Sequence, residues 1–250
     1  MTTRAYPVNA PSEQTQPTSR APERAREDQL VADLTLPVPR EGGSRRFLNI
    51  LVALVGIIVM VPVMCLIAAI VKMTSPGPVR FTQTRIGLDR RRRGSAPDTG
   101  TRRRDLGGQP FRIYKFRTMQ VQQDQTERWA SAGDARITAV GRVLRQYRVD
   151  ELPQLFNVLR GEMNVVGPRP EQPAIFARLR GRINRYARRQ LVRPGITGWA
   201  QVNLAYDQCE EDAKRKLQYD LEYIGKQSLT EDLRIMARTL PVMLGRKGAR

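Results

Sequence analysis

The sequence has 250 residues, and 43 Lys and Arg against 24 Asp and Glu give it a formal net charge of +19. It contains no histidine and two cysteines, Cys65 and Cys209. A Ser-His-Asp triad and a Cys-His dyad are therefore excluded, and a disulfide framework or a Cys/His zinc site is poorly supported. The charge predicts an anionic partner, which composition alone leaves open among nucleic acid, a phosphate-bearing substrate and acidic lipid.

Residues 1–44 are rich in Pro, Ser, Thr, Gln and charged residues and contain few large apolar ones. This composition predicts a disordered N-terminal arm. The arm carries five arginines and six acidic residues, so the positive charge belongs to residues 45–250.

Residues 47–71 form the apolar run FLNILVALVGIIVMVPVMCLIAAIV, which only Asn49, Gly56 and Pro62 interrupt. A helix of this length, rising about 1.5 Å per residue, would cross a hydrocarbon layer of about 30 Å, so the run predicts a membrane segment. The mostly polar stretch before it and the lack of a small-residue cleavage site after it argue against a signal peptide.

Pro62 lies past the middle of this run, where proline removes a backbone hydrogen bond. Basic residues flank both ends: Arg45, Arg46, Lys72 and Arg80. Because positive flanks favour the cytoplasmic side, we expect residues 45–73 to form a re-entrant helix that enters the membrane, breaks at Pro62 and returns. A tilted or kinked span is the alternative. Residues 74–250 contain no second run of this kind, so we expect them to form a domain on the membrane surface.

Two short strands are expected next. Residues 75–87 are typical of a Pro/Gly turn followed by a strand, and residues 109–119, QPFRIYKFRTM, alternate apolar with basic and hydroxyl residues. Between them, residues 89–108 hold seven arginines and three aspartates, which indicates an exposed Arg-rich loop.

A helix-helix corner is expected around Asp150 and Glu151. Apolar residues recur at helical spacing from Ile137 to Tyr147, and the helix should end near the two acids because Leu152 precedes Pro153. Pro153 suits the first turn of a second helix, PQLFNVLR, that ends at Gly161.

Residues 210–224 and 229–244 predict two amphipathic helices, whose apolar faces pack on the core or lie in the bilayer interface. Packing on the core is the commoner arrangement. The predicted fold class is α+β and predominantly helical, a membrane-associated globular domain with an N-terminal re-entrant helix broken at proline.

Asp150 and Glu151 are the candidate catalytic residues. An ionised carboxylate can attack phosphorus or hold Mg²⁺, and Arg145, Arg148 and Arg169 would favour ionisation if the fold brings them close. Phosphoryl transfer needs little beyond a nucleophile and cations that offset charge. Spacing alone leaves open a purely structural Arg-carboxylate corner.

Four stretches carry a resemblance to a known family: TSPGPVRFTQTRIG, FRIYKFRTM, DARITAVGRVLRQYRVDELPQLFNVLRGEMNVVGPRPE and RPGITGWAQVN. In this order, after one apolar segment, they closely resemble the bacterial sugar transferases, the monotopic phosphoglycosyl transferases that start glycan assembly on a polyprenol lipid. The resemblance covers residues 46–248 and leaves out the N-terminal arm.

The resemblance implies a role for several residues. The acidic dyad of the family falls on Asp150, the nucleophile and a ligand of Mg²⁺, and on Glu151, its acid/base partner. Its basic substrate ligands fall on Lys115, Arg117, Arg145, Arg169 and Arg193, the last of these near the uridine end. Its membrane segment is a re-entrant helix broken at a proline, which corresponds to Pro62.

The implied reaction has two displacements. Asp150 attacks the sugar-bearing phosphate of a UDP-sugar, with Mg²⁺ and the arginines offsetting charge, and UMP leaves. Polyprenyl phosphate, such as undecaprenyl phosphate, then takes the phosphosugar from Asp150. The implied location is the cytoplasmic face of the bacterial inner membrane, and the implied process is synthesis of exopolysaccharide, capsule, O-antigen or glycoconjugate.

The sequence departs from the family in two places. The family usually has a short turn where this chain has the loop 89–108, which is either a membrane-surface patch or a neutral insertion. Tyr147, Arg148 and Val149 precede the dyad, where the family more often has a small hydroxyl residue and Leu. Arg148 either contacts phosphate or faces water.

Two other functions compete with this one. A membrane-tethered nucleic-acid-binding protein would explain the arginine runs 90–93 and 102–104. However, no helix-turn-helix, zinc-finger or RNA-recognition motif is visible, so we expect no nucleic-acid partner. An inactive scaffold of the same family is the second alternative. The sequence leaves the donor sugar, the lipid length and the oligomeric state open.

Overall fold

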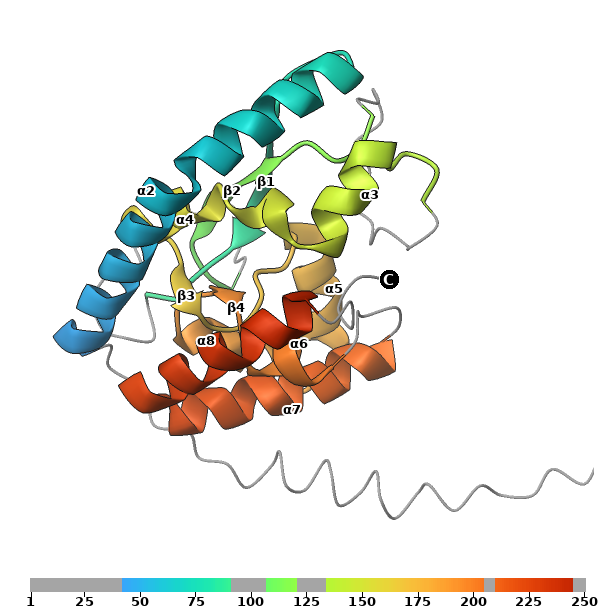
Figure 1. Cartoon of the computed structure of the whole chain (residues 1–250). Helices are drawn as coiled ribbons and strands as arrows, with labels where there is room; N and C mark the ends of the chain where they lie inside the picture. The colour runs from blue at the N-terminus through green and yellow to red at the C-terminus, as the bar shows by residue number, and fades with distance from the viewer. Residues whose placement is uncertain (1–41, 91–106, 121–133, 205–209, 245–250) are drawn as a thin grey trace, which may run out of the picture. The chain divides into compact units, whose positions relative to one another are not determined.

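The computed structural model describes residues 42–90, 107–120, 134–204 and 210–244. Figure 1 shows the course of the chain through these elements. They are α2 (Gly43–Thr74), β1 (Arg80–Ile86), β2 (Pro110–Phe116), α3 (Ala139–Gln146), the 3-10 helix η2 (Val149–Glu151), α4 (Gln154–Leu159), β3 (Asn164–Val166), α5 (Pro173–Arg182), the 3-10 helix η3 (Tyr186–Leu191), β4 (Gly195–Thr197), α6 (Trp199–Asn203), α7 (Glu210–Lys226) and α8 (Leu229–Leu244).

Helices dominate these elements, and the strands form two small sheets. The predicted strands are confirmed as β1 and β2, which pair antiparallel with Phe81 opposite Lys115. The second sheet pairs β3 and β4 in parallel, and it was not predicted. The predicted α+β, mostly helical fold is therefore confirmed.

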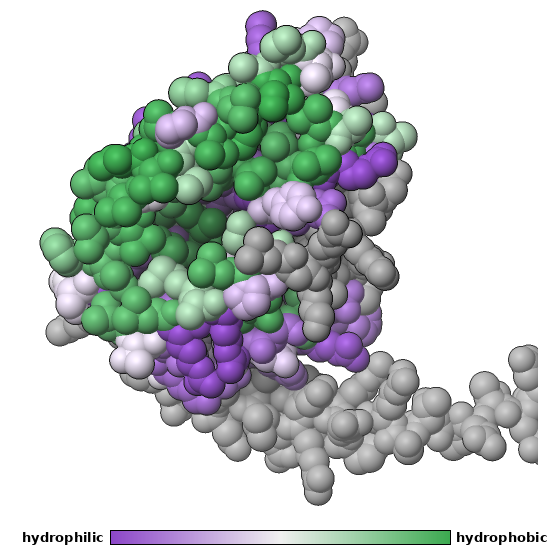
Figure 2. All heavy atoms as spheres, viewed as in Figure 1, coloured by the Kyte–Doolittle hydropathy of each residue, from purple (hydrophilic) through white to green (hydrophobic). Residues whose placement is uncertain are grey.

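Helix α2 is apolar and long enough to enter a membrane: in its most apolar 18-residue window, only 11 % of the residues are buried against the rest of the domain. A core helix of a soluble domain would instead bury most of such a stretch. Figure 2 shows hydrophobic side chains gathered over this helix. Its exposed large side chains include Phe47, Leu51, Leu54, Ile58, Val59, Leu66 and Met73.

The N-terminal part of α2 is fixed to the domain by polar contacts. Arg45 is buried and donates from Nε to Asp232 Oδ2 at 2.9 Å and from Nη2 to the Tyr223 hydroxyl at 2.8 Å. Asn49 accepts a hydrogen bond from the Val165 backbone N–H at 2.6 Å and donates to the Arg45 carbonyl at 2.7 Å. The polar residue inside the apolar run is therefore the attachment to β3.

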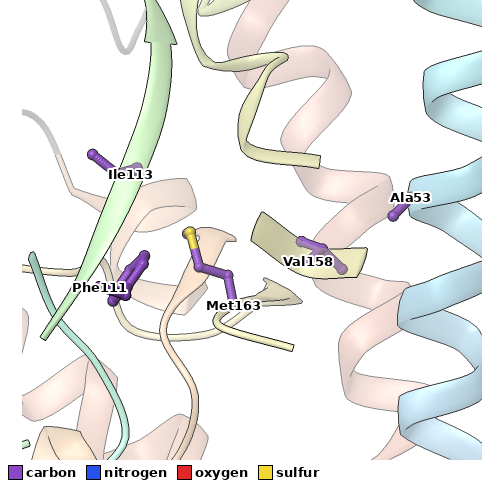
Figure 3. Close-up of a cluster of buried hydrophobic side chains, with 5 residues drawn as sticks. All are labelled: Ala53, Phe111, Ile113, Val158 and Met163. Atoms are coloured by element: carbon purple, nitrogen blue, oxygen red, sulfur yellow. The ribbon is translucent and has the colours of Figure 1, made fainter. Parts of the chain in front are cut away.

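Apolar packing fixes the middle of α2. Ala53 lies in a buried cluster with four residues of the domain, drawn in Figure 3: Phe111, Ile113, Val158 and Met163. A Cβ on Gly56 would lie 3.2 Å from a methyl group of Leu155, so a small residue lets α2 approach α4 closely. This packing holds α4, which follows the acidic corner directly, against the apolar helix.

The C-terminal part of α2 also rests on the domain. Ile67 and Val71 share a second buried cluster with Phe116 of β2 and Leu144 of α3. Arg117 then caps the helix end, donating from Nη2 to the Ser75 carbonyl at 2.8 Å. Both ends of α2 are thus attached to the same domain.

Helix α2 begins at Gly43, two residues before the predicted start, and continues through Pro62 to Thr74. Figure 1 shows it changing direction along its length. Proline removes one backbone hydrogen bond and pushes against the preceding turn, which bends a helix. The bend is therefore accommodated without an interruption of the helix, and the re-entrant path through a membrane stays a prediction.

The predicted corner is confirmed. Thr138 caps α3 by accepting a hydrogen bond from the Gly141 N–H at 2.9 Å, as hydroxyl residues do at helix starts. Arg148 has a φ of 54°, a left-handed conformation that ends α3 before the acids. Gly161, with a φ of 75°, follows α4 as predicted.

Glycines bring two separate motifs together at the β3–β4 pair. Gly167, after β3, donates to the Thr197 carbonyl at 2.9 Å, and Gly195 donates to the Pro168 carbonyl at 3.0 Å. A Cβ on Gly195 would lie 2.1 Å from the Gly167 nitrogen, a separation no side chain tolerates. The GPRP and RPG stretches are therefore neighbours because both contain glycine at the contact.

The two C-terminal helices differ in how much of their apolar surface is buried. Helix α7 buries Leu217, Leu221 and Ile224 in the core, whereas α8 buries Ile235 and leaves three leucines exposed: Leu229, Leu233 and Leu240. The commoner expectation of core packing thus holds for α7. The N-terminal arm up to residue 41 and residues 91–106 of the Arg-rich loop lie outside the described residues.

We expect the Asn49→Ala variant to unfold at a lower temperature than the wild type. The substitution leaves the Val165 N–H without its acceptor, and an unsatisfied buried donor costs about 1–3 kcal/mol. Thermal unfolding in detergent measures the change. Val59→Ala, at an exposed position on the same helix, is the control and should change the melting temperature little. Equal effects of the two substitutions would contradict the attachment role of Asn49.

Candidate active site

Asp150 and Glu151 lie in η2, between α3 and α4. Both are buried, with 6 % and 5 % of their surface exposed. Burial disfavours a charged carboxylate unless cations lie close to it. The pair is therefore not a solvated surface pair, and its chemistry depends on the cations around it.

Two cations hold Glu151. Lys115 Nζ, from β2, lies 2.7 Å from Glu151 Oε1, and Arg169 Nη2 lies 2.7 Å from the same oxygen. Burial opposes ionisation, but Arg169 and Lys115 outweigh it and hold the pKa of Glu151 well below its ordinary value. Arg148 acts in the same direction, so its charge reaches the dyad.

Asp150 differs from Glu151 in its direct partners and in its pKa. Within the part of the chain that the structure describes, its carboxylate makes no hydrogen bond or ion pair. Burial, which Lys115 only partly offsets, and the negative charge of Glu151 raise the pKa of Asp150 to about 6. The two adjacent acids thus have opposite pKa shifts, a pattern typical of catalytic carboxylates with different roles.

Arg145, in the last turn of α3, also faces this carboxylate, since its charge lowers the pKa of Asp150. Its Nη1 is buried and has no hydrogen-bond partner among the described residues. Leaving a buried donor unsatisfied costs about 1–3 kcal/mol. An anion bound beside Asp150 would satisfy this nitrogen.

Asn157 positions the strand that carries Lys115. It is fully buried in α4, accepts a hydrogen bond from the Tyr114 N–H at 3.1 Å and donates to the Arg112 carbonyl at 2.7 Å. Its amide therefore joins α4 to β2 on both sides of Ile113. This contact, which the sequence did not reveal, fixes Lys115 opposite the dyad.

The structure thus brings Lys115, Arg145 and Arg169 to the dyad, but it does not place the other two predicted ligands in this group. Arg117 is buried, and its guanidinium donates to the carbonyls of Val71, Ser75 and Pro76 at the end of α2. Arg193 donates to the Gly161 carbonyl at 2.8 Å, and burial lowers its pKa. Substrate binding by these two arginines stays a prediction.

Sequence reasoning missed a buried charge cluster next to the site, which we call the Arg189 cluster: Glu171, Tyr186, Arg189, Lys216 and Asp220. Arg189 Nε lies 2.7 Å from Asp220 Oδ2, and Lys216 Nζ lies 3.0 Å from Glu171 Oε1. One sequence signal was available, because Lys216 and Asp220 fall on the apolar face of α7.

A metal site made only of protein ligands is not found among the described residues, which contain no group of three or more acidic, His or Cys side chains suited to an ion. Mg²⁺ is commonly held by one or two carboxylates together with substrate phosphates. Asp150, whose carboxylate has no hydrogen-bond or ion-pair partner within the described ranges, fits that arrangement as the single protein ligand.

The sequence profile of bacterial sugar transferases matches residues 41–246, which include the dyad and every cation described above. The chain belongs to the bacterial sugar transferase family. The matched region begins at α2, so the apolar helix is part of the family's common structure.

Curated relatives of this chain are named as transferases of sugar phosphates to undecaprenyl phosphate. It is 40 % identical, over 86 % of its length and 47 % of the relative, to UDP-N-acetylgalactosamine-undecaprenyl-phosphate N-acetylgalactosaminephosphotransferase of Aeromonas hydrophila. Two further relatives are UDP-glucose:undecaprenyl-phosphate glucose-1-phosphate transferases. The chain is 42 % identical to that of Xanthomonas campestris pv. campestris, over 80 % of its own length and 38 % of the relative. It is 40 % identical to that of Caulobacter vibrioides, over 83 % of its own length and 73 % of the relative. The chain thus spans less than half of two of these three relatives.

We expect Arg117→Gln to lower the melting temperature of this sugar transferase. The substitution removes donors from the carbonyls at the end of α2, and buried unpaired groups cost about 1–3 kcal/mol each. Arg80→Gln, at an exposed position near the same end, is the control and should have little effect. A variant that keeps its melting temperature but loses activity would instead support substrate binding by Arg117.

Proposed function

We propose that this protein transfers a sugar-1-phosphate from a UDP-sugar to a polyprenyl phosphate and releases UMP. The observation that supports this most directly is the pair of adjacent buried carboxylates with opposite pKa shifts. Two cations hold Glu151, whereas Asp150 has no direct partner in the part of the chain that the structure describes. The names of the curated relatives point to the same reaction class.

Asp150 is the proposed nucleophile. With a pKa of about 6 it is mostly ionised at pH 7.5, and burial leaves it poorly solvated, which favours attack. One of its oxygens would bond to the sugar-bearing phosphorus while the bond from that phosphorus to the bridging oxygen breaks. UMP would leave with the bridging oxygen and its electron pair.

Glu151 takes a different role in this proposal. A carboxylate with a strongly lowered pKa exchanges protons poorly at neutral pH. Its two ion pairs favour a role in orienting Lys115 and Arg169 toward the phosphates, rather than the acid/base role that the resemblance implies.

The surrounding cations would bind the diphosphate. Arg145 offers a buried donor without a partner among the described residues, and Lys115 and Arg169 pair with Glu151. Such groups offset the negative charge that dominates the barrier to phosphoryl transfer. Mg²⁺, when held by Asp150 and the substrate phosphates, would supply further charge neutralisation.

The second half of the reaction would occur at the membrane surface. A phosphate oxygen of the lipid would attack the phosphorus on Asp150, and the Asp150 carboxylate would be released. Because α2 packs on α4 and η2 lies directly before α4, the dyad is close to the apolar helix that would hold the lipid tail.

The path of α2 favours a re-entrant helix. Its 32 residues would measure about 48 Å as a straight helix, yet both ends contact the same domain. If α2 spanned the membrane, its two ends would lie on opposite sides. The residues that contact one end, either Asp232 and Tyr223 or Arg117 and its neighbours, would then have to lie on the far side of the bilayer from the rest of the domain. We therefore propose that α2 dips into the cytoplasmic leaflet of the bacterial inner membrane and that the catalytic domain lies on the cytoplasmic face, as its basic flanks favour.

The decisive experiment is to trap the first half of the reaction. The purified protein is mixed with Mg²⁺ and a panel of UDP-sugars that includes UDP-glucose and UDP-N-acetylgalactosamine, without lipid. One donor should give a burst of UMP stoichiometric with the enzyme, together with a phosphosugar mass on the peptide that contains Asp150. Asp150→Asn should abolish both signals because an amide is a poor nucleophile.

Glu222→Gln, on an exposed ion pair of α7, is the control and should give the full burst. UMP release that persists in Asp150→Asn would contradict the proposed nucleophile. If the wild type released no UMP from any donor of the panel but still performed its role in cells, the result would support the scaffold alternative.

The rate of the UMP burst should depend on the ionisation of Asp150. Because the pKa of this acid is raised to about 6, the reactive carboxylate is present above that pH and disappears below it. We expect the burst rate to fall about tenfold between pH 7.5 and pH 5, with a slope of about one per pH unit. Single-turnover kinetics without lipid avoids titration of the lipid phosphate. A rate that stays constant down to pH 5 would contradict the raised pKa.

A further inference from the structure

Arg169 reaches Glu151 from the loop of residues 167–172, between β3 and α5, and this loop is held in an unusual way. Four successive carbonyls each accept a hydrogen bond from another part of the domain. Pro168 accepts from Gly195 N–H at 3.0 Å, Arg169 from Arg189 Nη2 at 2.9 Å, Pro170 from Arg85 Nη1 at 3.1 Å and Glu171 from Ile86 N–H at 3.0 Å. The backbone that carries Arg169 is therefore fixed at every peptide unit.

Of these four contacts, the one at Arg169 itself comes from a buried charged side chain. Arg189 is 2 % exposed and makes three further hydrogen bonds or ion pairs within its cluster. Nε donates to Asp220 at 2.7 Å, and Nη1 donates to the Tyr186 hydroxyl at 2.6 Å and to Glu171 at 3.4 Å. The guanidinium also lies 5.0 Å from the centre of the Tyr186 ring. A planar guanidinium with five donors can join three elements in this way, and a lysine cannot.

The Arg189 cluster is electrically balanced. Arg189 and Lys216 supply two positive charges, and Glu171 and Asp220 supply two negative ones. Lys216 and Arg189 outweigh burial and lower the pKa of Glu171 to about 2. Burial raises the pKa of Asp220, and Arg189 and Lys216 only partly offset that effect.

We infer that Arg189 is a positioning residue of the active site: through the Arg169 carbonyl, it sets the loop so that the Arg169 guanidinium reaches Glu151. This inference rests on the proposed function for its catalytic consequence. Arg189 touches neither carboxylate of the dyad directly in the contacts described. Its effect on catalysis is therefore transmitted by Arg169.

Coupling between the two arginines tests this inference. Arg189→Lys keeps the charge but cannot reach Asp220, Tyr186 and the Arg169 carbonyl together. We expect it to lower the UMP burst rate about tenfold in the wild type and less than about twofold in the Arg169→Gln background, because groups that act through one another are not additive. Equal losses in both backgrounds would overturn the inference, since they would mean that Arg189 acts independently of Arg169.

A milder variant guards against misfolding. Tyr186→Phe removes the hydroxyl that accepts from Arg189 but keeps the ring beside Phe176, so it should show the same non-additivity with a smaller loss. Ile224→Val, on the buried face of α7, is the stability control. It should lower the melting temperature without changing the burst rate, and a comparable loss of rate in this control would assign the effect of Arg189 to general destabilisation.

Hydrogen exchange separates this inference from the proposed function. In Arg189→Lys, backbone amides in residues 163–172 should exchange faster, whereas those in β2 should be unchanged. This measurement requires no turnover, so it remains decisive even if the wild type released no UMP. Unchanged exchange in residues 163–172 would overturn the positioning role.

Discussion

The attachment of α2 at both of its ends is the constraint on which the rest of the structure depends. Arg45 holds the first turn to Asp232 of α8, and Arg117 holds the last turn to the end of β2. Between them, an apolar face packs on α4, while the opposite face stays exposed. Because α4 follows the acidic corner, docking of the apolar helix and placement of Asp150 and Glu151 are one packing problem. In the proposed reaction, this arrangement lets a water-soluble donor and a membrane lipid meet at one site.

The site itself depends on an unequal division of charge between two adjacent acids. Lys115 and Arg169 both pair with Glu151, while the Asp150 carboxylate has no direct partner among the described residues, and burial raises its pKa. Three distant elements supply this arrangement: β2 carries Lys115, η2 carries the acids and the loop after β3 carries Arg169. Buried polar groups fix each element, as Asn157 does for β2 and the Arg189 cluster does for the loop. Such supporting contacts hold reacting groups in the geometry that catalysis requires.

The sequence was sufficient for features with a local cause. The length of the apolar run predicted α2, and hydrophobic periodicity predicted β1, β2 and the helices on both sides of the corner. Pro153 marked the start of the second of these helices, and Gly161 marked its end. Prediction from the sequence failed where contacts between segments far apart in the chain determine the structure. The β3–β4 pair has three residues per strand and forms because two glycines meet across 28 residues of chain. Arg117 follows Lys115 by two positions, yet the strand ends at Phe116, and the side chain turns to α2. The residues around Arg189 carry no sign of its burial, and the available signal lies in α7, where Lys216 and Asp220 fall on the apolar face.

The central claim is that both ends of α2 lie on the side of the membrane that carries the catalytic domain. Single cysteines at Ser44 and Thr74, exposed at the two ends, test it in a variant that lacks Cys65 and Cys209. Neither cysteine should react with a membrane-impermeant maleimide in intact bacterial spheroplasts, and both should react after lysis. A cysteine in place of Lys226 in α7 reports the side of the domain itself and should give the same result. Labelling of one end but not the other in intact spheroplasts would mean that α2 spans the membrane and would contradict the account.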